Sequence, residues 1–205
     1  YRPKKLIMTD LPCVILCGGK SSRMGEDKSL LPFSSSNSLA QFQYDRLKTF
    51  FKNIYISSKT DKFNFLEKDN LILDKNQDVY SPILALETIF EKFIDKKIFI
   101  LTVDTPFVSI ESIERIIKES SDVDICIAQT EKIHNLCGVF SSTINLTIKS
   151  MIEKDIHKIF YLIKNSKYKI IEFLDDDEFM NINNKNEYHK SINFINKSYN
   201  SNNLK

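Results

Sequence analysis

Three of the four glycines in this 205-residue chain lie between positions 18 and 25, directly after the apolar run Cys13 to Cys17. A chain so sparing with glycine is expected to place it where the backbone needs unusual freedom. Gly18 and Gly19 can form a tight turn that aims successive backbone N–H groups at one point, which suits a phosphate. The segment therefore favours a strand followed by a phosphate-binding loop.

Two basic side chains follow these glycines, Arg23 and Lys28. Arg23 offers a planar fork of donors and Lys28 a point charge. An ion pair between one of these side chains and a triphosphate oxygen, at about 4 Å and an effective dielectric constant of about 20, contributes about 4 kcal/mol before desolvation. A loop that only turns the chain would not require both charges, so we interpret the segment as a nucleotide site.

Two better-known phosphate loops are excluded by spacing. Gly19-Lys20-Ser21 resembles the end of a Walker loop, but that motif needs a glycine five residues earlier, where Val14 stands. The chain has no G-x-G-x-x-G either, which disfavours a dinucleotide-binding fold.

Strand-like and helix-like apolar segments alternate along the chain, which is typical of parallel βαβ units. Ser81-Pro82 and Ser109 are predicted helix starts, because serine caps free N–H groups and proline fits the first helical position. We expect a three-layer α/β/α fold with a mostly parallel, Rossmann-like sheet. Strands are expected at 13–17, 54–56, 71–73, 97–103, 123–128 and 169–173, and helices at 39–51, 81–94, from 109, 143–151 and 155–164.

Length and composition are those of one globular domain, which we place at residues 1–190. The Asn-, Ser- and Lys-rich stretch 191–205 is expected to be a flexible tail. The net charge is +2 and both signs are interspersed, so no nucleic-acid partner is indicated. With no apolar run long enough to span a bilayer and no signal-peptide core, we expect a cytoplasmic protein without a membrane partner. The four cysteines are interpreted as buried, reduced thiols.

Two aspartates follow predicted strands. Asp104 comes after the most apolar one, and ligands of open α/β sheets collect at the carboxyl ends of strands. A carboxylate there can hold Mg²⁺, although it could instead cap the turn before Pro106. Asp74 follows the 71–73 segment, and spacing alone leaves it open between a turn residue and a ligand.

The segment Leu16 to Lys28 reads L-x-G-G-x-x-x-R-M-G-x-D-K, which closely resembles the signature loop of the molybdenum cofactor guanylyltransferase family. Asp104-Thr105-Pro106-Phe107 resembles that family's metal-binding segment. Residues 179–183, Phe-Met-Asn-Ile-Asn, resemble its F-x-N-[IV]-N segment. The resemblance spans residues 11–190, and this chain has one residue fewer between Met24 and Asp27, which could shift Lys28.

This resemblance implies a fold of the nucleotide-diphospho-sugar transferase type and transfer of GMP from GTP to the phosphate of molybdopterin, with release of pyrophosphate. It implies that Arg23, Lys28 and Asp104 are catalytic, that Mg²⁺ binds Asp104, and that Asn181 and Asn183 contact molybdopterin. It also implies transient contact with other proteins of cofactor biosynthesis. The implied GTP-binding residues are Leu16, Cys17, Gly18, Gly19, Lys28, Asp74 and Asp104.

Two departures from the family pattern keep alternatives open. The family has G-P-L-A-G where this chain has Ser81-Pro82-Ile83-Leu84-Ala85, which places β-carbons where backbone approaches the ligand. The family often has Asn near Ser57-Ser58-Lys59. A cytidylyltransferase of the same fold, acting on a pterin or a sugar-type alcohol phosphate, therefore remains an alternative. A non-catalytic nucleotide-binding protein is another, but it would not need to retain both Lys28 and Asp104.

Overall fold

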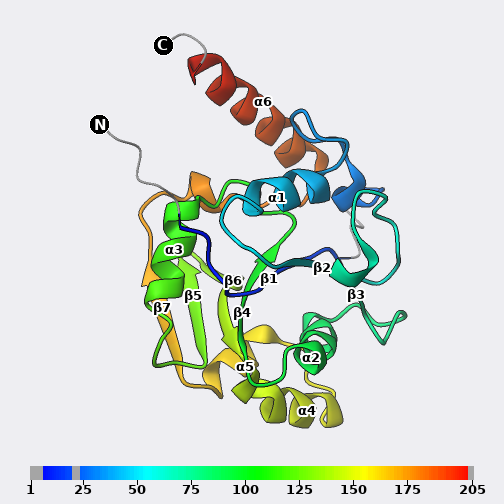
Figure 1. Ribbon diagram of the computed structural model, residues 1–205, viewed down its shortest axis with the longest axis vertical. Coiled ribbons are helices and arrows are strands. Elements are labelled where there is room, and N and C mark those ends of the chain that lie inside the picture. Colours follow the sequence, from blue (N-terminus) through cyan, green and yellow to red (C-terminus); the bar gives the residue numbers. More distant parts are fainter. Residues whose placement is uncertain (1–6, 20–23, 203–205) are drawn as a thin grey trace.

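The computed structural model describes residues 7–19 and 24–202 of the chain, with side chains up to residue 196. In this part of the chain, the strands form one seven-stranded sheet in the order β3-β2-β1-β4-β6-β5-β7 (Figure 1). The strands are β1 (Cys13–Leu16), β2 (Ile54–Ser58), β3 (Leu71–Leu73), β4 (Lys97–Thr102), β5 (Ile125–Gln129), β6 (Ile133–Ser141) and β7 (Tyr168–Glu172).

The sheet is mostly parallel, as expected, and β6 is its exception. Strand β1 pairs in parallel with β2 and β4, as β2 does with β3 and β5 with β7. The sequence patterns did not predict β6, which runs antiparallel between β4 and β5. Its Gly138 has a structural reason, since a β-carbon there would lie 2.1 Å from the carbonyl oxygen of Cys126.

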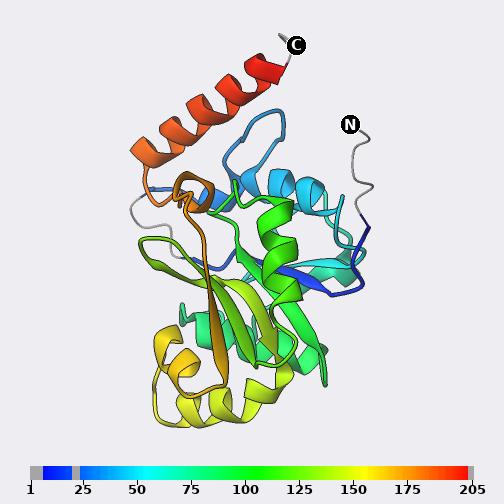
Figure 2. The ribbon, with the colours of Figure 1, turned by 90° about the vertical axis from the view of Figure 1, so that its left-hand side faces the viewer.

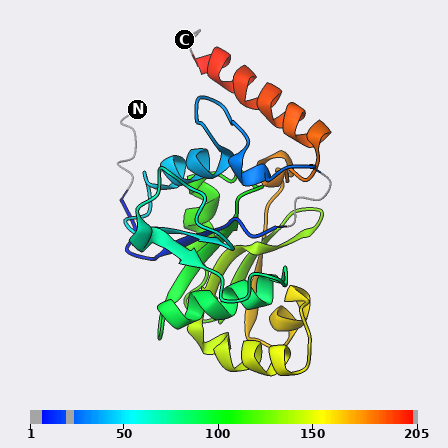
Figure 3. The same cartoon turned by 90° about the vertical axis from the view of Figure 1, so that its right-hand side faces the viewer.

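Helices cover both faces of the sheet and give the expected three layers (Figures 1 and 3). On one face lie α1 (Leu39–Leu47) and α3 (Ile110–Lys118), and on the other lie α2 (Pro82–Lys92), α4 (Asn145–Glu153) and α5 (Ile159–Lys164). Alternate residues of β1 enter the two cores: Cys13 and Ile15 face α1 and α3, whereas Val14 and Leu16 face α2 and α4. No helix in the described ranges is long and apolar enough to cross a membrane.

Both predicted serine caps are confirmed. Ser81 Oγ accepts from the Ile83 N–H at 3.2 Å, and Ser109 Oγ accepts from the Ser112 N–H at 3.1 Å. Pro82 occupies the first turn of α2. These caps satisfy N–H groups that a helix end leaves without partners, so α2 and α3 begin where the sequence places them.

A sixth helix, α6 (Lys185–Asn202), covers most of the stretch expected to be a flexible tail (Figure 2). Ser191 is fully buried and Ile195 is 6% exposed, packed into the core beneath α1 and α3. Widely spaced apolar residues in a polar stretch gave little helical signal, and the helix is stabilised by the core that it meets. The boundary of the single domain at residue 190 stays a prediction.

The four cysteines are free and buried, as the sequence predicts. Burial raises the pKa of each thiol above its usual range. A neutral thiol is a poor nucleophile and a poor metal ligand, so the chemistry of this protein must come from other side chains.

The strand order places a topological switch point beside β1. The chain proceeds outward from β1 to β2 and β3, then crosses to the other side of β1 to form β4. The loops that leave the carboxyl ends of β1 and β4 therefore diverge, and this is where open α/β sheets bind ligands.

Candidate active site

A cavity of about 420 Å³ opens at this switch point. We call it the switch-point cavity. It is lined by six of the predicted site residues: Leu16, Gly18, Gly19, Lys28, Asp74 and Asp104. They come from the ends of β1, β3 and β4 and from the loop after β1, so the fold assembles residues that lie far apart in the sequence.

The Lys28 ammonium lies 2.5 Å from Asp104 Oδ2 and also donates to the Ile182 carbonyl oxygen at 3.3 Å. Lys28 begins a short 3₁₀ helix, η1 (Lys28–Leu30). The two charged side chains are each 14% exposed. The basic residue of the glycine loop and the acidic residue after β4 therefore face each other in the cavity.

Asp27 fixes the start of η1 and so orients Lys28. Its Oδ1 accepts from the Ser29 N–H at 3.0 Å and from the Ser29 hydroxyl at 2.7 Å, while its Oδ2 pairs with Lys62. Burial opposes the charge of Asp27, but the bonds from Lys62 and Ser29 outweigh it and hold the pKa of this carboxyl below its usual range. Gly25, with φ of +78°, provides the left-handed turn just before it.

Asp104 does not cap the turn before Pro106. That turn is closed by Thr105, whose N–H and hydroxyl both bond the Thr102 carbonyl oxygen, at 3.3 and 2.9 Å. The second carboxylate oxygen, Asp104 Oδ1, is buried and has no hydrogen-bond partner among the described residues. A buried anionic oxygen without a partner is costly, so this atom suits a bound cation.

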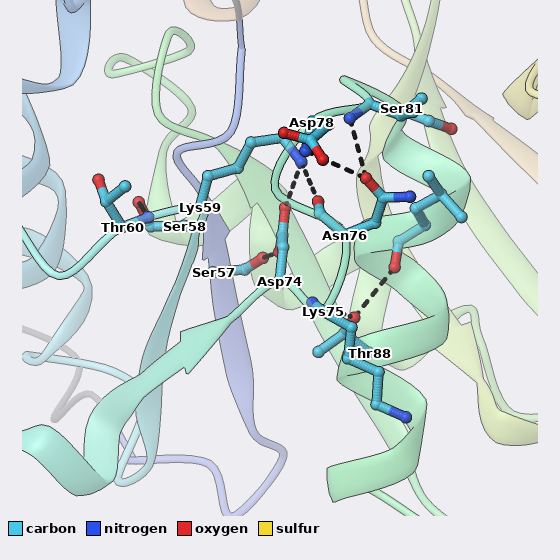
Figure 4. Close-up of polar contacts among 12 residues, drawn as sticks. Ser57, Ser58, Lys59, Thr60, Asp74, Lys75, Asn76, Asp78, Ser81 and Thr88 are labelled. Atoms are coloured by element: carbon cyan, nitrogen blue, oxygen red, sulfur yellow. Dashed lines mark hydrogen bonds and ion pairs between the residues drawn. The ribbon is translucent and has the colours of Figure 1, made fainter.

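Asp74 directly follows β3, which lies on the other side of β1 from β4 and Asp104. A network of polar contacts holds its carboxylate (Figure 4). Ser57 Oγ donates to Asp74 Oδ1 at 3.0 Å, and the Lys59 ammonium lies 3.5 Å from Asp74 Oδ2. Lys59 also donates to the Asn76 carbonyl oxygen at 2.5 Å and lies 5.1 Å from the centre of the Tyr80 ring. In the sequence, Lys59 belongs only to a segment that departs from the family pattern, whereas in the fold it holds the Asp74 carboxylate.

Gly18 lies against Asp74, since a β-carbon at Gly18 would be 3.6 Å from Asp74 Oδ2. Ser81 and Ala85, which replace glycines of the family pattern, also line the cavity. The cavity thus has a charged end at Lys28 and Asp104 and a second end of mixed polarity around Asp74 and Ser81.

The 179–183 segment lies against the charged end. The Ile182 N–H donates to the Asp104 carbonyl oxygen at 2.8 Å. Asn181 Oδ1 is buried without a hydrogen-bond partner among the described residues. Phe179 anchors the segment by packing on His134 with ring centres 4.8 Å apart, and burial lowers the pKa of that histidine. Asn181 and Asn183 therefore flank a residue that touches both Lys28 and Asp104.

Two predicted residues stand apart. Arg23 lies outside the described residues. Cys17 does not line the cavity: its side chain enters the core, and its N–H donates to the Ser57 carbonyl oxygen at 2.8 Å.

The switch-point cavity brings together a glycine loop, a lysine and a carboxylate, and these groups are suited to the binding of a nucleoside triphosphate by a nucleotidyltransferase. A family model described as a MobA-like NTP transferase domain matches residues 13–166. The molybdenum cofactor guanylyltransferase of Campylobacter jejuni (strain RM1221) is 43% identical over 188 residues, covering 89% of this chain and 96% of that protein. The chain belongs to the molybdenum cofactor guanylyltransferase family.

A more distant relative agrees with this assignment, and a solved structure agrees with the fold. The molybdenum cofactor guanylyltransferase of Helicobacter pylori (strain ATCC 700392 / 26695) is 30% identical over 203 residues, covering 96% of this chain and 99% of that protein. The crystal structure of molybdopterin-guanine dinucleotide biosynthesis protein A from Archaeoglobus fulgidus superposes with a TM-score of 0.74. It covers 91% of this chain and 100% of that chain at 16% identity, which supports the fold.

Proposed function

We propose that this protein transfers a guanylyl group from GTP to the terminal phosphate of molybdopterin and releases pyrophosphate. The observation that carries the proposal is the meeting of the glycine loop, Lys28 and Asp104 in one cavity at the switch point. The acceptor phosphate attacks the α-phosphorus in line, and no covalent enzyme intermediate is required. Catalysis then consists of positioning and of stabilising charge.

The charged end of the cavity receives the triphosphate. The backbone N–H groups of Gly18 and Gly19 and the Lys28 ammonium bind phosphate oxygens, and Lys28 stabilises the charge that develops on the departing pyrophosphate. Asp27 and Lys62 keep Lys28 in place through η1. A contribution from Arg23 stays a prediction from the sequence.

Asp104 fits a divalent cation, because its buried Oδ1 has no hydrogen-bond partner among the described residues. No group of three or more His, Cys, Asp or Glu in the described ranges could hold a metal ion. Mg²⁺ often binds through one or two carboxylates together with substrate phosphates, and the buried Asp104 carboxylate fits this mode of binding. When bound, Mg²⁺ neutralises charge on the phosphates.

The other end receives the nucleoside. Asp74, held by Ser57 and Lys59, offers carboxylate oxygens to hydrogen-bond donors of the base. Guanine presents two adjacent donors on its pairing edge, the ring N–H and the amino group, which suits such an acceptor.

The proposal predicts that GTP binds more tightly than CTP or ATP. Isothermal titration calorimetry of the three triphosphates in Mg²⁺ gives their dissociation constants, and pyrophosphate release with molybdopterin tests the transfer. If CTP bound more tightly than GTP, the proposed activity would be cytidylyl transfer in place of guanylyl transfer. Binding of GTP without any pyrophosphate release on addition of molybdopterin would favour a non-catalytic nucleotide-binding protein.

Asn181 and Asn183 are proposed to contact molybdopterin, because their amides offer both donors and acceptors beside the charged end. Changing both to Ala is expected to raise the apparent KM for molybdopterin by roughly tenfold, the size of one to two lost hydrogen bonds, with an unchanged GTP dissociation constant. Asn184→Ala is the matched control, since that side chain instead caps α6 by accepting from the Glu187 N–H. An unchanged KM in the double variant would contradict the pterin contact.

A further inference from the structure

A chain of hydrogen bonds reaches the switch-point cavity from the connection between α4 and α5. His157 Nδ1 lies 2.8 Å from Ser81 Oγ, and His157 Nε2 lies 2.9 Å from Asp155 Oδ1. Ser81 lines the cavity and is 7% exposed (Figure 4 shows it at the start of α2). The proposed reaction uses neither His157 nor Asp155, although their hydrogen bonds end at the substrate cavity.

The end of α4 places this pair. Asp155 follows the helix in the left-handed conformation, with φ of 55°, and its N–H bonds the Ile152 carbonyl oxygen at 3.0 Å. Aspartate tolerates this conformation better than most residues. The resulting turn brings His157 to the start of α2, where Ser81 lies.

The hydrogen bonds define which groups donate. A carboxylate offers only acceptors, so His157 Nε2 must carry a proton. With the ring neutral, Nδ1 has a lone pair and accepts a hydrogen bond from the Ser81 hydroxyl. Ser81 Oγ also accepts from the Ile83 N–H at 3.2 Å. Its hydroxyl proton and one lone pair are then used, and one lone pair remains.

We propose that Ser81 Oγ accepts a hydrogen bond from a donor group on the nucleoside of the bound GTP, and that His157, oriented by Asp155, is the positioning residue that makes Ser81 an acceptor. This inference rests on the proposed function. Without His157, the hydroxyl would be free to rotate and to present its proton to the substrate instead, which would repel a donor.

Ser81 is at the right end of the cavity for this role. The phosphates are assigned to Gly18, Gly19 and Lys28, whereas Ser81 and Asp74 come from the connection between β3 and α2, and the apolar Pro82 and Ala85 follow Ser81 in the cavity lining. The ring N–H of guanine is assigned to Asp74, which leaves two kinds of donor on guanosine for Ser81: the amino group on C2 of the base, which has two hydrogens, and the ribose hydroxyls. The chemistry required of Ser81 is the same for both.

The test compares dissociation constants for GTP, ITP, 2′-deoxy-GTP and 3′-deoxy-GTP at pH 8. ITP lacks the amino group, and each deoxynucleotide lacks one hydroxyl. Ser81→Gly removes Oγ but keeps α2 capped, since glycine at this position costs a helix little. Ser81→Gly is expected to raise the GTP dissociation constant about fivefold, the size of one net hydrogen bond. The dissociation constant of the one analogue that lacks the group donating to Ser81 should stay unchanged. That analogue identifies the donor.

Variants of His157 test the positioning role. His157→Asn places an amide oxygen near the position of Nδ1 and should keep the wild-type preference for GTP over that analogue. His157→Phe has no acceptor and should lose the preference as Ser81→Gly does. His189→Phe, which changes an exposed histidine of α6, is the matched control.

Melting temperatures separate a structural role of Ser81 from a role in nucleoside recognition, because a loss of helix capping lowers the melting temperature and weakens the binding of all four nucleotides alike. Equal weakening of all four in Ser81→Gly, or unchanged GTP binding, would overturn the inference. A wild-type preference in His157→Phe would overturn the role of His157. If wild-type protein bound no GTP at all, the proposed function itself would fail, and this result is distinct from the others.

Discussion

Asp104→Asn is expected to lower the rate of Mg²⁺-dependent pyrophosphate release by about 10²-fold or more, the loss typical of one group that stabilises a transition state. Asparagine keeps the size of the side chain but removes the charge that would face a cation. The effect should be large because Asp104 Oδ1 is buried and has no hydrogen-bond partner among the described residues, so the charge that is removed is one that can face a cation.

The fold should survive this change. The Asp104 carbonyl oxygen still accepts from the Ile182 N–H, and the turn is closed by Thr105 rather than by the carboxylate. Melting temperature and turnover are therefore measured on the same sample, with the exposed Asp61→Asn as the matched control. Normal turnover of Asp104→Asn at saturating Mg²⁺ would mean that the metal, if required, is held elsewhere.

Lys28→Met is expected to raise the GTP dissociation constant by roughly 10- to 100-fold, since one close charge pair with a phosphate is worth about 4 kcal/mol before desolvation. Methionine keeps much of the aliphatic stem and removes the ammonium. Because much of the contribution is Coulombic, the difference between wild type and variant should shrink as the salt concentration rises. Calorimetry at two ionic strengths measures both effects.

Lys52→Met is the matched control, because Lys52 is an exposed lysine that pairs with Asp10 on the surface. Exposed ion pairs contribute little, so its GTP affinity should equal that of wild type. If Lys28→Met also bound GTP as wild type does, the loop after β1 would be a turn and not a phosphate site.

Local patterns predicted much of the fold because they depend on neighbouring residues. Ser81 and Ser109 each cap the N–H groups in the first turn of the helix that follows them in the sequence. The run from Leu71 to Leu73 forms β3 within the predicted bounds. The sequence patterns did not predict β6, because this segment forms a strand through its pairing with neighbouring strands and has no clear strand pattern of its own. Its segment contains a histidine, an asparagine and a glycine, and it becomes a strand by pairing with both β4 and β5.

Much of the candidate site could also be predicted from sequence. The glycine loop, Lys28 and Asp104 have chemically informative side chains or backbone at recognisable spacings. The strand order then explains why Lys28 Nζ and Asp104 Oδ2, from residues 76 positions apart, lie 2.5 Å from each other. Their roles in binding and catalysis stay predictions until they are tested. Lys59 and His157 carried no signal of this kind, because a lone lysine or histidine gains its meaning from the groups that it faces.

The class of fold, the starts of α2 and α3, the position of the glycine loop and the family could all be predicted from the amino-acid sequence, since each depends on short-range chemistry or on a motif. The packing of β6 and α6, the position of Asp104 opposite Lys28 instead of in a cap of its turn, and the contact of His157 with Ser81 became visible in the folded chain alone. Those outcomes depend on contacts between distant segments, and such contacts exist only once the sheet and its helices have brought those segments together.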